Sequence, residues 1–139
     1  MTRSSILRPS LGFLFLSTLS TGLPAALAPR FFYDHFPFAA EWVHLLPPYN
    51  EHLVTDVGEL YLGFAVMFGW AAWTCQRTLV RAVCSAWILS ATLHLIFHAA
   101  HLEDFGAGDA AAEIFSLAVL LVPAVLALWA ARDAGELAS

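Results

Sequence analysis

Two sets of titratable residues share one spacing in this chain of 139 residues, and the residue types at that spacing could bind an ion. Histidine, aspartate and glutamate stand at positions 52, 56 and 59, and histidines stand at positions 94, 98 and 101. Residues at i, i+4 and i+7 form one stripe along a helix. Ionisable groups are costly to place inside a membrane-like segment, so they tend to occur there where they bind something. The two stripes therefore predict a metal or proton site.

Antiparallel packing of the two helices would bring the stripes together level by level. We expect three facing pairs: His52 with His101, Asp56 with His98, and Glu59 with His94. Each level joins an imidazole to a carboxylate or to a second imidazole, a ligand set that suits Zn, Fe, Mn or Cu. Glu113 could close the site from a third side. The expected metal ligands are therefore His52, Asp56, Glu59, His94, His98, His101 and Glu113, with Asp56, Glu59, His94 and His98 at the centre.

Three other interpretations of the stripes remain open. A buried hydrogen-bond network could tie the two helices together without a metal. The stripes could also pass a proton or metal ion, since histidines titrate near neutral pH. Almost no polar residue continues below Glu59 and His94, which favours a site that is open on one side only. Haem held by axial histidines is the third interpretation, but closely stacked histidines beside two carboxylates suit bare ions better.

The composition is that of a membrane protein. Hydrophobic residues make up 60% of the chain and charged residues only 12%, whereas soluble domains average about 25% charged residues. Four apolar spans can be read at about residues 6–28, 53–74, 82–101 and 110–131, each near the roughly 20 residues that cross a bilayer. We expect one all-α domain, an antiparallel bundle of four transmembrane helices, with a kink at Pro123 in the fourth.

Charge gives the expected orientation. The six basic residues are all arginine. Five of them lie before or at the start of the first span, in the loop after the second, or after the fourth: Arg3, Arg8, Arg77, Arg81 and Arg132. The positive-inside rule then places both termini in the cytoplasm, as expected for a multi-pass protein of the bacterial inner membrane. All six histidines and nine of the eleven acids fall at the opposite, outer end. A net charge of −5 without a basic patch argues against nucleic-acid binding.

The first span has a second interpretation, as a secretory signal peptide. Arginines precede an apolar run that ends in Ala26-Leu27-Ala28, a pattern typical of such peptides. Pro29 follows the would-be cleavage site directly and normally blocks cleavage. We therefore expect the span to be retained.

The outer loop, residues 29–51, is rich in aromatic residues. A loop of about 20 residues without structure is unusual in a compact domain. Its aromatic side chains suggest either a lid over the site or a belt that anchors the protein in the membrane interface. Asn50 is expected to cap the second helix.

One segment carries a resemblance. Residues 48–58, Pro-Tyr-Asn-Glu-His-Leu-Val-Thr-Asp-Val-Gly, resemble a block found in small four-helix membrane proteins of bacteria. The outline of the chain is also similar to that of DoxX-like proteins, although no diagnostic DoxX residue is matched. The resemblance implies a four-helix fold and carries no activity or ligand.

The expected function is a membrane enzyme with a metal site at the extracytoplasmic face, an oxidoreductase that acts on a lipid-like or quinone-like substrate. Proton or metal-ion transport or sensing, haem binding, and an accessory role in a larger membrane complex or homo-oligomer are the alternatives. The chain has no nucleophile elbow, no phosphate-binding glycine loop and no Cys-x-x-Cys pair, which excludes the chemistries that depend on those motifs.

Overall fold

Every regular element in the described part of the chain is a helix. The computed structural model describes residues 4–38, 40–46 and 48–132. Four helical stretches are long and apolar enough to cross a membrane: α1 (Ser4–Leu27), α3 (Glu51–Thr74), α4 (Arg77–Ala99), and α5 (Ala107–Val119) continued by α6 (Leu121–Ala130). Two short elements, α2 (Pro29–His35) and η1 (Val43–Leu45), lie between α1 and α3. The prediction of an all-helical chain with four apolar spans is confirmed.

The helix ends follow local sequence signals. The Asn50 side chain accepts a hydrogen bond from the Leu53 backbone N–H at 3.2 Å, so it caps α3 as predicted. Cys75 adopts a left-handed conformation with φ 51° just after the last turn of α3. Because Cys75 and Gln76 complete the turn, α4 begins already at Arg77, several residues before the predicted start of the third span.

The fourth span is interrupted between α5 and α6, as we predicted from the presence of Pro123. Proline has no N–H, so the carbonyl of Val119 four residues earlier has no helical donor. Helix α5 ends at that residue, and α6 resumes at Leu121. The indole Nε1 of Trp87 on α4 donates to the Leu120 carbonyl at 3.3 Å, which supplies a donor at the break.

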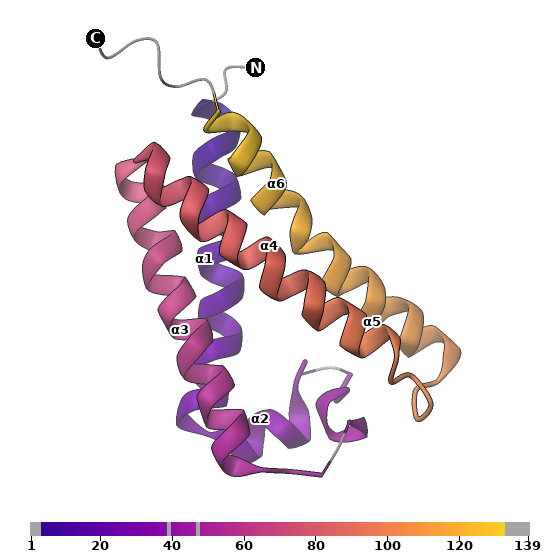
Figure 1. The fold of residues 1–139 in the computed structure, drawn as a ribbon. Helices are drawn as coiled ribbons and strands as arrows, with labels where there is room; N and C mark the ends of the chain where they lie inside the picture. The colour runs from indigo at the N-terminus through magenta and orange to yellow at the C-terminus, as the bar shows by residue number, and fades with distance from the viewer. Residues whose placement is uncertain (1–3, 39, 47, 133–139) are drawn as a thin grey trace, which may run out of the picture.

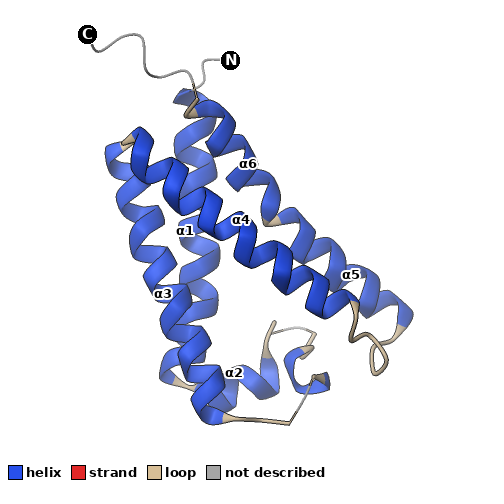
Figure 2. Cartoon of the chain, viewed as in Figure 1, coloured by secondary structure: helices blue, strands red, loops and turns tan. Residues whose placement is uncertain are grey.

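The long helices form two pairs that meet at one end and separate toward the other (Figure 1). Helix α1 packs along α3, while α4 packs against α5 and α6, and α6 also contacts α1. Figure 2 shows that short loops join these helices, except between α1 and α3, where α2 and η1 lie at the open end. Fully buried side chains gather where the pairs meet, among them Leu11, Leu14, Phe68, Val80 and Val83.

Helices α1 and α3 approach closely at two glycines. A Cβ atom on Gly58 would lie 2.3 Å from the backbone nitrogen of Ala26, and one on Gly22 would lie 3.0 Å from the carbonyl oxygen of Gly58. Small residues let apolar helices bring their backbones together, which is how such helices associate in lipid. This contact fixes α3 against α1 in the half of the molecule where α3 and α4 have separated.

Candidate functional site

A cavity of about 800 Å³ lies between the two helix pairs at the open end of the molecule. Its wall combines side chains of α1, α2, α3, α4, α5 and the segment that holds η1, and most of them are apolar or aromatic. A volume of this size lies within the range of sites for small organic ligands, which are typically apolar with a few placed polar groups. The polar groups therefore decide what the cavity can bind.

The principal polar feature of the wall is a hydrogen-bonded pair, His98 on α4 and Glu113 on α5. The His98 Nδ1 atom lies 2.7 Å from the Glu113 Oε1 atom. The two residues are only 7% and 4% exposed, although both line the cavity. A separation this short is typical of a charge-assisted hydrogen bond. The second carboxyl oxygen of Glu113, Oε2, is buried and has no hydrogen-bond partner among the described residues.

His94 lies one turn before His98 on α4 and lines the same cavity. The two imidazole rings meet edge to face, with their centroids 4.3 Å apart. Phe97 lies beside His98 with ring centroids 5.8 Å apart and also lines the cavity. The polar pair is therefore set among aromatic rings.

The other predicted ligands lie away from the cavity wall. His52 Nε2 lies 3.4 Å from Asp56 Oδ2 on the same helix, an exposed ion pair of the i, i+4 type. Glu59 is exposed on α3. The His101 ring stacks on Phe97, and its Nδ1 lies 2.8 Å from the Phe97 carbonyl oxygen.

The predicted facing of the two stripes is not found. Among the described residues, none of the three pairs expected between α3 and α4 forms a hydrogen bond or an ion pair. The physical reason is the close contact between α3 and α1 at Gly58, which holds α3 away from the C-terminal half of α4 (Figure 1). His98 pairs instead with Glu113, the residue expected to approach from a third side.

The metal centre predicted from these residues is correspondingly not preformed. Among the described residues, no group of three or more histidine, cysteine, aspartate or glutamate side chains could hold a metal ion. His94, His98 and Glu113 share one wall of the cavity, whereas Asp56 and Glu59 of α3 do not line it. The binding of a metal ion stays a prediction.

The opposite wall contains hydroxyl groups that sequence reasoning missed. Ser17, Ser20 and Thr21 on α1 line the cavity. The hydroxyls of Ser20 and Thr21 donate to the Ser17 carbonyl at 2.9 and 3.1 Å, so their oxygen lone pairs stay available as acceptors. Their spacing of i, i+3 and i+4 within an apolar helix was the signal that could have indicated a polar face.

Residues 29–38, 40–46 and 48–50, here named the lid segment, lie at the open end of the molecule, and several of them line the cavity. Its aromatic residues Phe32, Phe36 and Trp42 line the cavity, which supports the predicted lid. The indole Nε1 of Trp42 donates to the Asp109 carboxylate at 3.2 Å, so the lid segment is fastened to the first turn of α5.

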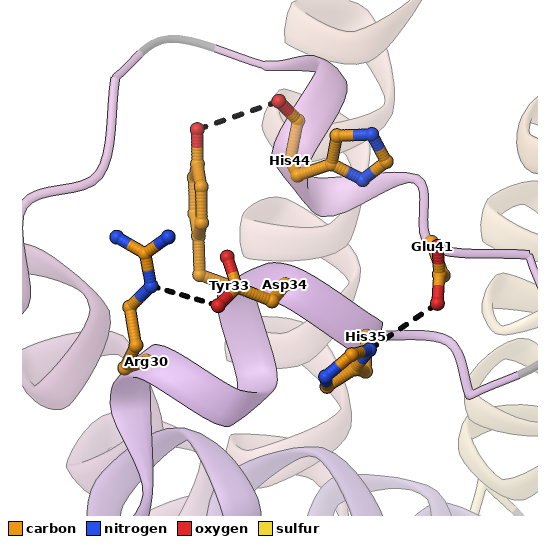
Figure 3. A network of polar contacts seen from close by, with 6 residues as sticks. All are labelled: Arg30, Tyr33, Asp34, His35, Glu41 and His44. Carbon is orange, nitrogen blue, oxygen red and sulfur yellow. Dashed lines mark hydrogen bonds and ion pairs between the residues drawn. The ribbon is translucent and has the colours of Figure 1, made fainter.

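Polar contacts hold the lid segment together (Figure 3). Arg30 donates to Asp34 at 2.7 Å within α2, and that hydrogen bond, with the carboxylate's charge, raises the pKa of the guanidinium. His35 Nδ1 lies 3.2 Å from Glu41 Oε1. The Tyr33 hydroxyl, in turn, donates to a backbone carbonyl of η1 at 3.4 Å. These contacts join α2 to η1 as one structural unit.

Comparisons of the chain with protein-family models, curated proteins and solved structures find no match. The chemistry of the cavity therefore carries the functional argument.

Proposed function

We propose that the protein binds an apolar small molecule, lipid-like or quinone-like, in the cavity between the two helix pairs. The observation that carries this proposal is a buried His98–Glu113 pair in the wall of an otherwise apolar cavity of about 800 Å³. An apolar body would fill the cavity, and the pair would fix the ligand's polar end. A lid segment rich in aromatic residues supports the proposal, because it lines the cavity with side chains suited to an apolar ligand.

The proposal includes the membrane as the source of the ligand. We infer that the four apolar stretches cross the bacterial inner membrane as an antiparallel bundle with both termini in the cytoplasm. Arg8, Arg77, Arg81 and Arg132 support this orientation, because they lie in the first turns of α1 and α4 or just after α6, at the end where the helix pairs meet. The Arg8 guanidinium donates to Cys75 Sγ at 3.4 Å, which joins the start of α1 to the turn between α3 and α4. The cavity then lies toward the extracytoplasmic side and can receive a ligand from the outer leaflet.

A substitution that fills the cavity tests the proposal. Val57 on α3 lines the cavity, so a tryptophan there should take up space that the ligand needs. We expect Val57→Trp to reduce the amount of decylubiquinone retained by the protein in native mass spectrometry by about fivefold or more, equivalent to about 1 kcal/mol of lost binding.

Val66→Trp is the matched control. Val66 lies on the same helix, is exposed, and does not line the cavity, and its replacement adds the same side chain. We expect this variant to retain decylubiquinone like the unmodified protein. Equal retention by all three proteins would mean that the probe binds outside the cavity, and the absence of retention in all three would contradict the proposed function.

A metal-dependent oxidoreductase is the second candidate, favoured by the close approach of His94 and His98 beside the free oxygen of Glu113. In this account Zn, Fe, Cu or Mn would bind these three side chains after a local rearrangement. Elemental analysis of protein purified in mild detergent should then show about one metal ion per chain. The metal should be lost in a His94→Ala/His98→Ala variant, and a metal content near zero in the unmodified protein would remove this candidate.

A further inference from the structure

Four arginines lie at the end of the molecule where the helix pairs meet, and are here named the arginine cluster: Arg8, Arg77, Arg81 and Arg132 (Figure 1). The Arg8 guanidinium donates to Cys75 Sγ at 3.4 Å, two residues before α4 begins. Arg77 and Arg81 are spaced i, i+4, so they share one face of α4. Arg132 follows α6, whose last turn packs beside the start of α1. The four side chains therefore belong to one surface.

The charge of the arginine cluster is not neutralised by the described part of the protein. The guanidinium groups of Arg77, Arg81 and Arg132 form no hydrogen bond or ion pair with any described residue. The Nε atom of Arg77 is buried and lacks an acceptor, so part of a charge is withdrawn from water without compensation. By contrast, Arg30 at the other end pairs with Asp34 at 2.7 Å. The cluster is thus suited to an anion from outside the protein.

The acids of the chain leave this surface positive. The nine acids that the structure describes all belong to the half of the molecule that contains the cavity. Asp133 and Glu136 follow Arg132 in the sequence and lie outside the described residues. Even if both reached this end, the four arginines would outnumber them. Like charges at i, i+4 repel each other, so an anion beside Arg77 and Arg81 would also relieve that repulsion.

Three tryptophans indicate that this anion belongs to a lipid. Trp70 and Trp73 lie in the last turns of α3, Trp129 lies in the last turn of α6, and all three are exposed. In membrane proteins, tryptophans gather at the level of the lipid headgroups. The helices that carry them are long and apolar enough to cross a membrane. The arginine cluster therefore lies at the level of the phospholipid phosphates.

We propose that the arginine cluster binds the phosphate of an anionic phospholipid, such as phosphatidylglycerol, in the leaflet at this end of the molecule. Guanidinium N–H groups donate in pairs to phosphate oxygens, which suits arginine to this headgroup. An anionic lipid is favoured over a zwitterionic one because no amine in its headgroup offsets the phosphate charge. In the orientation proposed above, this is the inner leaflet. The inference rests on the proposed membrane placement, but not on a ligand in the cavity.

A competition between two phospholipids with identical acyl chains tests the inference. Dioleoylphosphatidylglycerol has a net negative charge and dioleoylphosphatidylcholine has none, and native mass spectrometry in mild detergent measures the retention of each. One basic residue at an anionic headgroup is worth about fivefold in affinity, so the unmodified protein should prefer phosphatidylglycerol by about tenfold or more. We expect Arg77→Gln/Arg81→Gln to reduce this preference to about twofold or less. Arg30→Gln, at the other end, is the control and should leave it unchanged.

The measurement on unmodified protein does not depend on the folding of a variant. Equal retention of the two lipids by that protein would overturn the inference. A preference that survives in a helical Arg77→Gln/Arg81→Gln variant, or that is lost in Arg30→Gln, would do the same by placing the lipid elsewhere. Displacement of phosphatidylglycerol by an equal concentration of inorganic phosphate would indicate a site for soluble anions and would also overturn it. Decylubiquinone retention by the same samples reports on the cavity separately, so the two proposals can fail independently.

Discussion

Replacing Gly58 with alanine is expected to lower the free energy of unfolding by about 1–3 kcal/mol, the usual cost of forcing a methyl group into a filled site. The added Cβ would lie 2.3 Å from the Ala26 backbone nitrogen and 2.7 Å from the Ala25 carbonyl carbon. These atoms belong to the backbone of α1 and cannot rotate aside, so the two helices must separate. Thermal or denaturant unfolding in mild detergent, followed by circular dichroism, measures the effect.

Gly63→Ala is the matched control on the same helix. A Cβ atom at Gly63 has nothing within 4 Å, so alanine should leave the stability unchanged or raise it through its higher helix propensity. The separation of α1 from α3 also moves two walls of the cavity, so Gly58→Ala should weaken decylubiquinone retention as well. Equal stability of the two variants would show that the close approach of α1 and α3 does not hold the fold together.

The helices themselves could be predicted from the sequence because their signals are local. Hydropathy over about 20 residues located the four apolar stretches, Asn50 marked the start of α3, and Pro123 marked the interruption of the fourth. Each of these features depends on residues within a turn or two of one another. The main error in the helix bounds, at the start of α4, arose because a turn of two residues is shorter than the arginine-containing loop that the sequence suggested.

The facing of the stripes could not be predicted in this way because it depends on which helix each one contacts. The periodicity of His52, Asp56 and Glu59 places them on one face of α3 but does not say which helix that face meets. The decisive signal was the glycine pair Gly22 and Gly58, which lies on two different helices and brings α3 to α1. His98 remained part of the site because α5 packs beside α4 and presents Glu113 to it.

Breaking the His98–Glu113 pair is expected to have the other large effect. Glu113→Leu leaves His98 Nδ1 without its partner, and His98→Phe leaves a carboxyl group buried without a partner. Each single substitution should lower the free energy of unfolding by about 2–4 kcal/mol, because a buried polar group that loses its partner keeps its full desolvation cost. The double variant should recover most of this loss, since neither polar group remains. The measurement is a double-mutant cycle by unfolding in mild detergent.

The recovery of stability separates a structural role of the pair from its role toward a ligand. In the double variant the cavity keeps its apolar wall but loses the pair that fixes the ligand's polar end, so it should retain less decylubiquinone while being nearly as stable as the unmodified protein. His52→Phe and Asp56→Leu form the matched cycle on an exposed pair, for which the coupling should be below about 0.5 kcal/mol. Additive losses for His98 and Glu113 would mean that the two side chains do not act as one buried unit. A double variant that retains as much decylubiquinone as the unmodified protein would show that the pair does not fix the ligand's polar end.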